Sequence, residues 1–164
     1  MITLHAWPTP NAHKVSIMLE ECGLEYEVEA VDITAGDQFA PAFLDLCPNN
    51  RMPVLVDDDG PEGNSVSIFE SGAILIYLAD KAGKFMPPSG NARYEVMQWL
   101  MFQMGNLGPI CGQAHHFRDA APERVPYAIN RFTDEAGRLY SVMDRRLAET
   151  TYLAEDGYSI ADMA

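Results

Sequence analysis

The sequence is poor in basic residues and in cysteine, and it has no long apolar run. Its 164 residues include 11 Lys and Arg against 24 Asp and Glu, so the formal net charge is -13. An acidic surface repels nucleic acid and anionic membranes, because both carry negative charge. No apolar segment approaches the roughly 20 residues that span a bilayer. We therefore expect neither nucleic acid nor a membrane as a partner.

The cysteines and histidines indicate neither a disulfide scaffold nor a metal site. The chain has an odd number of cysteines, without CxxC spacing: Cys22, Cys47 and Cys111. This pattern is typical of a protein in a reducing compartment. No secretory signal opens the chain, so the expected location is the cytoplasm. The adjacent His115 and His116 would point to different faces of a helix, and no Cys/His cluster completes a site. We predict no metal.

The stretch at 6–23 (AWPTPNAHKVSIMLEECG) is typical of a tight turn followed by the first helix. Thr9 suits the N-cap, Pro10 the first helical position and Gly23 the C-terminal stop. The polar groups of Thr9 and Asn11 then lie at the positive end of a helix dipole, which favours an anion such as a thiolate. A simpler reading, in which Thr9 only caps the helix, stays open.

Alternating apolar residues predict four strands in the first half of the chain. A strand before and a strand after the first helix form a βαβ unit, so this pair should be parallel. Two later strands are joined by a Gly- and Asp-rich loop and should be antiparallel. The strands are expected at 1–6, 26–33, 54–56 and 65–69, followed by a helix at 73–82 with Ser71 as its N-cap.

The second half of the chain is typical of helices. Residues 84–90 (KFMPPSG) are rich in glycine and proline and form a predicted linker. Apolar residues at helical spacing follow over 91–111 and 122–149, and Gly105 to Pro109 should bend or end the first of these helices. A capping-box spacing at 159–162 announces another helix just before the last residue, so we expect a longer protein.

Several motifs together resemble the bacterial nu-class glutathione transferases. They are 9–14 (TPNAHK), 71–78 (SGAILIYL), 112–117 (GQAHHF), 126–129 (PYAI) and 158–162 (YSIAD). The resemblance implies an α/β, thioredoxin-like, glutathione-binding N-terminal domain (βαβ-ββα, mixed sheet) over 1–83 and a linker at 84–90. An all-α domain over 91–164, incomplete at its C-terminus, would follow. It also implies a homodimer that carries out glutathione-dependent reduction of disulfide bonds.

The same resemblance assigns residues to each part of glutathione. Thr9 and Asn11 would be catalytic and would stabilise the thiolate of bound glutathione, since the turn holds no cysteine nucleophile. Glu70 and Ser71 would hold the γ-glutamyl end at a helix N-terminus. Gln38 would be a further contact in the loop after the second strand.

Two more contacts follow from the resemblance. The backbone of Met52, before a cis peptide to Pro53, would bind the cysteinyl part of glutathione as an added strand does. The side-chain type at position 52 should then matter little. Arg131 would reach a glutathione carboxylate.

Two rival functions stay open. The protein could conjugate glutathione to small electrophiles from the same site, or it could bind without catalysis. The expected ligands are glutathione or glutathione disulfide, with a small disulfide or electrophile as second substrate. Cys47 lies near the predicted site and is interpreted as a buried, inert thiol rather than a redox cysteine.

Overall fold

The computed structural model describes residues 1–155 and 157–164. The chain divides into two compact units, Met1–Met86 with Met163, and Pro87–Asp162 with Ala164. Each unit has its own buried apolar side chains, such as Leu4 and Leu75 in the first and Leu100 and Leu139 in the second.

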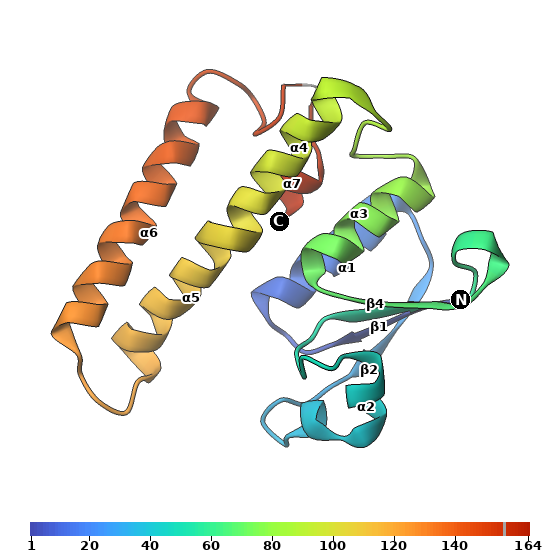
Figure 1. The fold of residues 1–164 in the computed structure, drawn as a ribbon, viewed down its shortest axis with the longest axis horizontal. Helices are drawn as coiled ribbons and strands as arrows, with labels where there is room; N and C mark the ends of the chain where they lie inside the picture. Colours follow the sequence, from blue (N-terminus) through green and yellow to red (C-terminus); the bar gives the residue numbers. More distant parts are fainter. Residues whose placement is uncertain (156) are drawn as a thin grey trace. The chain divides into compact units, whose positions relative to one another are not determined.

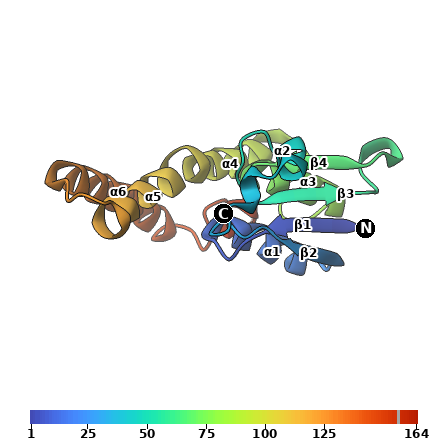
Figure 2. The ribbon, with the colours of Figure 1, turned by 90° about the horizontal axis from the view of Figure 1, so that it is seen from below.

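The first unit is built on a mixed four-stranded sheet. The strands are β1 (Ile2–Ala6), β2 (Tyr26–Ala30), β3 (Val54–Asp57) and β4 (Val66–Phe69). Their order is β2-β1-β3-β4, as Figure 2 shows along the sheet edge. β1 and β2 run parallel, whereas β3 is antiparallel to both β1 and β4. The predicted thioredoxin-like βαβ-ββα arrangement is thus confirmed.

Three helices cover this sheet. α1 (Pro10–Cys22) and α3 (Ser71–Ala82) lie together on one face, and α2 (Pro41–Leu46) lies on the other (Figure 1). The core between the sheet and the helix pair is fully buried and apolar, with Val15 from α1 and Leu55 from β3 among its members. Burial of this kind stabilises a fold by about 25 cal/mol for each Å² of apolar surface.

Several element boundaries differ from the sequence prediction by a few residues, and two of these differences have a local cause. β2 ends at Ala30 rather than at residue 33, because the Asp32 carboxylate accepts hydrogen bonds from the backbone N–H groups of Thr34 (2.8 Å) and Ala35 (3.2 Å) and closes a turn. Ser71 is not the N-cap of α3. The helix begins at Ser71, and Glu70 takes the cap position without a side-chain cap hydrogen bond.

The second unit is helical. It contains α4 (Gly90–Phe102), a π-helical turn (Gln103–Leu107), α5 (Gly108–His115), a second π-helical turn (His116–Ala120) and α6 (Pro126–Leu147), and α7 (Ile160–Met163) begins within it. The expected bend near Gly105 is realised as a widened helical turn rather than as a break. Pro109 is the second residue of α5 and directly follows this widened turn.

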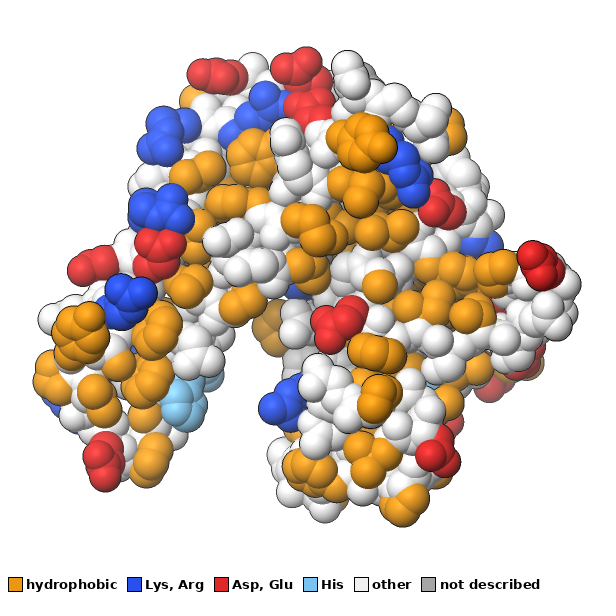
Figure 3. Space-filling view, in the orientation of Figure 1, with side chains coloured by type: hydrophobic (Ala, Val, Ile, Leu, Met, Phe, Trp, Pro, Cys, Tyr) orange, Lys and Arg blue, Asp and Glu red, His pale blue; other side chains and the backbone are white. Residues whose placement is uncertain are grey.

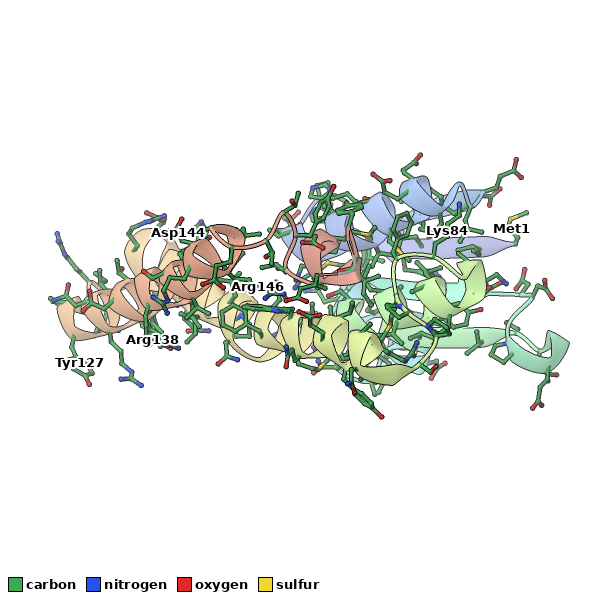
Figure 4. All side chains as sticks on the ribbon, turned by 90° about the horizontal axis from the view of Figure 1, so that it is seen from above. Met1, Lys84, Tyr127, Arg138, Asp144 and Arg146 are labelled. Carbon is green, nitrogen blue, oxygen red and sulfur yellow. The ribbon has the colours of Figure 1, made fainter. Side chains whose placement is uncertain are left out.

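Arg146 ties the end of α6 to the rest of this unit. Its guanidinium donates to the Glu95 carboxylate on α4 and to the Leu153 carbonyl (2.8 Å), and it lies 5.8 Å from the centre of the Trp99 ring. Figure 4 labels Arg146, together with Tyr127, which points away from the helices. Such a partly buried, charge-assisted contact fixes the connection that follows α6.

On the face shown in Figure 3, apolar side chains form the larger patches, and acidic and basic side chains are scattered among them. None of the helices in the described residues is both long enough and apolar enough to cross a membrane.

Candidate active site

A cavity of about 270 Å³ in the first unit gathers six of the eight residues assigned from the sequence. It lies where the N-terminal ends of α1 and α3 meet the chain that enters β3. Its lining consists of Thr9, Asn11, Cys47, Asn49, Arg51, Met52, Pro53, Glu70 and Ser71. Most of these side chains are polar, so the cavity is suited to a polar ligand.

Thr9 is the N-cap of α1 and also faces the cavity. Its backbone is extended (φ -138°, ψ 155°), and its Oγ1 accepts a long hydrogen bond of 3.4 Å from the Ala12 backbone N–H. The same hydroxyl donates to the Met52 Sδ at 3.4 Å. Asn11 lies in the first turn with its side chain exposed. The capping role and a role in the cavity are therefore compatible.

The cavity wall before β3 contains the cis peptide bond between Met52 and Pro53. Met52 is half-buried and packs against an apolar cluster made of Val31, Phe43, Cys47 and Val54. Its side chain thus bridges this cluster and the Thr9 hydroxyl. Met52 was expected to contribute through its backbone alone, and this side-chain contact was not predicted from the sequence.

The N-terminus of α3 forms the opposite wall. Ser71, the first residue of the helix, is 6% exposed. Glu70 precedes it with an exposed side chain and a φ of 73°, a conformation that side chains rarely adopt. The positive end of the helix dipole and the backbone N–H groups of the first turn favour an anion here. A carboxylate beside them can hold a cation in the same ligand.

A buried network holds α3 against β3 behind the cavity. Asp57, which is 1% exposed, accepts hydrogen bonds from the Tyr77 hydroxyl (2.6 Å) and the Lys81 ammonium (2.8 Å). Burial would raise the pKa of Asp57, but these two donors hold the pKa below its usual value. The pKa of Tyr77 is raised by burial and by its bond to the carboxylate. The network joins α3, whose first residue lines the cavity, to β3, which directly follows the lining residue Pro53.

Gln38 and Arg131 are not among the lining residues of this cavity. Gln38 lies in a 3₁₀ turn (Asp37–Phe39) and donates from Nε2 to the Ile33 carbonyl at 3.4 Å. Its Oε1 is buried and has no hydrogen-bond partner within the described part of the chain. Arg131 is exposed on α6 in the other unit. Both assignments stay predictions.

Asn49 and Arg51 line the cavity and were missed from the sequence. Both side chains are exposed, and Arg51 is the one cation among the lining residues. The polar run PNNR directly before the Met-Pro pair was a usable signal, because a residue next to that pair must lie at the same edge of the sheet. It had been interpreted only as a turn.

Cys47 also lines the cavity, but its side chain is 1% exposed and belongs to the apolar cluster. A buried, apolar environment of this kind is typical of an inert, structural cysteine. Within residues 1–155 and 157–164, no group of three or more His, Cys, Asp or Glu side chains is placed to hold a metal ion.

Known proteins match this chain in sequence and in fold. Residues 1–80 match the model of the glutathione S-transferase N-terminal domain. The disulfide-bond oxidoreductase YfcG of Escherichia coli is 48% identical over 165 residues, a match that covers 100% of this chain and 77% of YfcG. The chain belongs to the glutathione transferase superfamily. Within it, the chain is similar to the nu-class disulfide-bond oxidoreductases.

Two further family members support this placement. The disulfide-bond oxidoreductase YghU of Escherichia coli is 43% identical, over 99% of this chain and 58% of YghU. A glutathione transferase structure from Pseudomonas putida, with one glutathione disulfide bound per subunit, superimposes with a TM-score of 0.96. It is 45% identical, and the match covers 99% of this chain and 71% of that one. The chain thus spans between 58% and 77% of the length of these relatives.

Proposed function

We propose that this protein binds glutathione in the cavity between α1, α3 and β3 and uses it to reduce disulfide bonds. One observation carries the proposal. Thr9 and Asn11, at the N-terminus of one helix, and Glu70 and Ser71, at that of another, line a single cavity of about 270 Å³. Two helix N-termini at one cavity provide places for a carboxylate and for a thiolate in the same ligand.

The lining residues match the charged ends of glutathione. The α-carboxylate of the γ-glutamyl end would accept hydrogen bonds from the Ser71 hydroxyl and the first N–H groups of α3, while its ammonium would meet the Glu70 carboxylate. The exposed Arg51 guanidinium is suited to the glycine carboxylate at the other end. The backbone of Met52 would pair with the cysteinyl residue in between.

The chemistry requires a thiolate at neutral pH. The Thr9 hydroxyl, the Asn11 amide and the positive end of α1 would lower the pKa of the glutathione thiol at this position. The thiolate attacks one sulfur of the substrate disulfide, forms a mixed disulfide with it and expels the other substrate sulfur as a thiolate. A second glutathione thiolate then attacks the mixed disulfide, releasing the second substrate thiol and glutathione disulfide.

The relatives support this reading. YfcG and YghU are disulfide-bond oxidoreductases, and the Pseudomonas putida enzyme holds glutathione disulfide, the product that the proposed reaction would form. Because the chain is shorter than these relatives, its activity has to be measured on the chain itself.

The first test compares two reactions of the purified 164-residue chain. We expect glutathione-dependent reduction of a small disulfide, such as hydroxyethyl disulfide, to exceed conjugation of glutathione to an aryl halide. The variants Thr9→Val and Ser71→Ala should lose activity. Cys47→Ser is the matched control in the cavity wall and should keep it, because glutathione supplies the nucleophile.

Each contrary result has a distinct meaning. Conjugation without disulfide reduction would assign the protein to the conjugating transferases. Glutathione binding without either reaction would indicate a binding protein. Loss of activity in a folded Cys47→Ser variant would show that a protein thiol takes part.

A further inference from the structure

The side chain of Met52 makes a contact that the proposed reaction does not use. Its Sδ lies 3.4 Å from the Thr9 Oγ1. A thioether has no proton, so the hydroxyl must be the donor and the sulfur the acceptor. A lone pair of the same hydroxyl oxygen faces the Ala12 backbone N–H at 3.4 Å. The proton and one lone pair of the Thr9 hydroxyl are therefore both engaged by the protein itself.

A threonine hydroxyl has a single proton, and this limits what Thr9 can do at one time. To stabilise the thiolate of bound glutathione, the hydroxyl has to turn its proton away from Met52 and toward the ligand sulfur. A thioether is a weak acceptor, whereas a thiolate is charged and accepts more strongly. The exchange is therefore favourable once the ligand has ionised, but the contact with Met52 is lost in the process.

We propose that Met52 is a positioning residue whose thioether holds the Thr9 hydroxyl in the resting site and competes with the glutathione sulfur for its proton. The inference rests on the proposed function, since it needs glutathione in this cavity. Met52 thereby sets how far Thr9 can lower the pKa of the glutathione thiol. If Met52 acts in this way, the residue type at position 52 matters because its side chain must carry an acceptor atom, in contrast to the expectation from the resemblance.

The surroundings of Met52 allow a conservative test. The side chain is half-buried and packs against the apolar cluster of Val31, Phe43, Cys47 and Val54. Met52→Leu keeps nearly the same volume against this cluster and removes the acceptor, and exchanges of this kind are well tolerated in cores. Met101→Leu is the matched control. It replaces the same side chain by the same residue, but on α4, where Met101 is 46% exposed.

The measurement is the pKa of the bound glutathione thiol, followed by the ultraviolet absorbance of the thiolate. The complex with S-methylglutathione, which cannot ionise at sulfur, supplies the baseline and removes the protein thiols from the difference. We expect Met52→Leu to lower this pKa, so that the acid ionisation constant of the thiol rises about 2.5- to 5-fold. At 1.4 kcal/mol for each factor of ten, this change corresponds to the loss of a weak hydrogen bond of about 0.5–1 kcal/mol. Met101→Leu should leave it unchanged.

A double-mutant cycle separates competition from packing. In a Thr9→Val background there is no hydroxyl proton to compete for, so adding Met52→Leu should not change the pKa further. In a Thr9→Ser background, which keeps a hydroxyl and the helix cap, the effect of Met52→Leu should return. A purely structural role of Met52 would give the same shift in all three backgrounds and would overturn the inference.

The remaining outcomes are also decisive. An unchanged or raised pKa in Met52→Leu, with normal glutathione binding, would refute the competition and leave the proposed function intact. If wild-type protein does not bind glutathione, the proposed function itself fails and the inference fails with it. Calorimetric titration of each variant with glutathione distinguishes these two cases.

Discussion

Glu70 has an unfavourable backbone conformation and also places a carboxylate at the cavity. Replacing it should therefore change the free energy of unfolding and the affinity for glutathione in opposite directions. Its φ and ψ are 73° and 114°. A side chain held in such a sparsely populated region costs about 1–3 kcal/mol. Glycine avoids this cost but loses about 0.4–1 kcal/mol through the greater freedom of its unfolded chain. Glu70→Gly should therefore raise the free energy of unfolding by about 1 kcal/mol, or roughly 2–4 °C in Tm.

The same variant should bind glutathione less tightly. A hydrogen bond to a charged group contributes about 1.5–3 kcal/mol, and we take the lower end because the Glu70 side chain is exposed. About 1.4 kcal/mol corresponds to tenfold weaker binding. Glu70→Gln and Glu70→Ala keep a Cβ and thus the backbone strain, so they should bind weakly without becoming more stable. Denaturant unfolding and calorimetry with glutathione measure both quantities on the same samples.

Two results would contradict this reasoning. A Glu70→Gly protein less stable than wild type would show that the side chain stabilises the fold more than its backbone strains it. A Glu70→Gln protein with wild-type affinity would remove the carboxylate from ligand binding. The α3 cap itself should survive all three changes, because the Ile74 N–H donates to the backbone carbonyl of residue 70.

Two further predictions concern charges buried in the first unit. Lys14 is 6% exposed, and burial lowers its pKa from 10.5 to about 8, a penalty of about 3 kcal/mol on the charged form. The Lys14→Met protein should therefore be about 2–3 kcal/mol more stable than wild type at pH 7. The free energy of unfolding of the wild type should rise between pH 8 and about 10, because the unfolded chain binds more protons than the folded chain in this range. A free energy that does not change over this range would mean that the Lys14 ammonium is solvated. Asp57→Asn should lose about 2 kcal/mol at pH 7, since it leaves Lys81 without its carboxylate. The difference in stability between the two proteins should shrink below about pH 4 and vanish once the pH is below the lowered pKa of Asp57, because the wild-type carboxylate is then protonated. Urea unfolding at several pH values measures this difference.

Signals confined to a few neighbouring residues predicted most of the first unit. The Thr9 cap, the proline after it and the glycine stop at Gly23 set the limits of α1, and each acts within one helical turn. The sheet followed from alternating apolar residues and from the chain length between strands. The boundaries near Asp32 and Ser71 were wrong because a side-chain turn and a strained backbone compete there with the same local pattern.

Contacts between distant residues could not be predicted in this way. The hydrogen bond between Asp57 and Tyr77 joins residues 20 positions apart, and the one between Glu95 and Arg146 joins residues 51 positions apart. Taken singly, each of these residues resembles an ordinary surface or helix residue. Such groups meet only after the elements have packed, so their spacing in the sequence carries no signal.

Thr9 shows how the two kinds of information combine at the site. Its cap position is a local property and was predicted, and resemblance to the nu-class enzymes added a role toward sulfur. The partner of its proton, Met52, is 43 positions away and was assigned to the site for its backbone. A residue placed correctly in the cavity can thus have its chemistry in an unexpected atom, because the fold decides which end of the residue faces the reacting group.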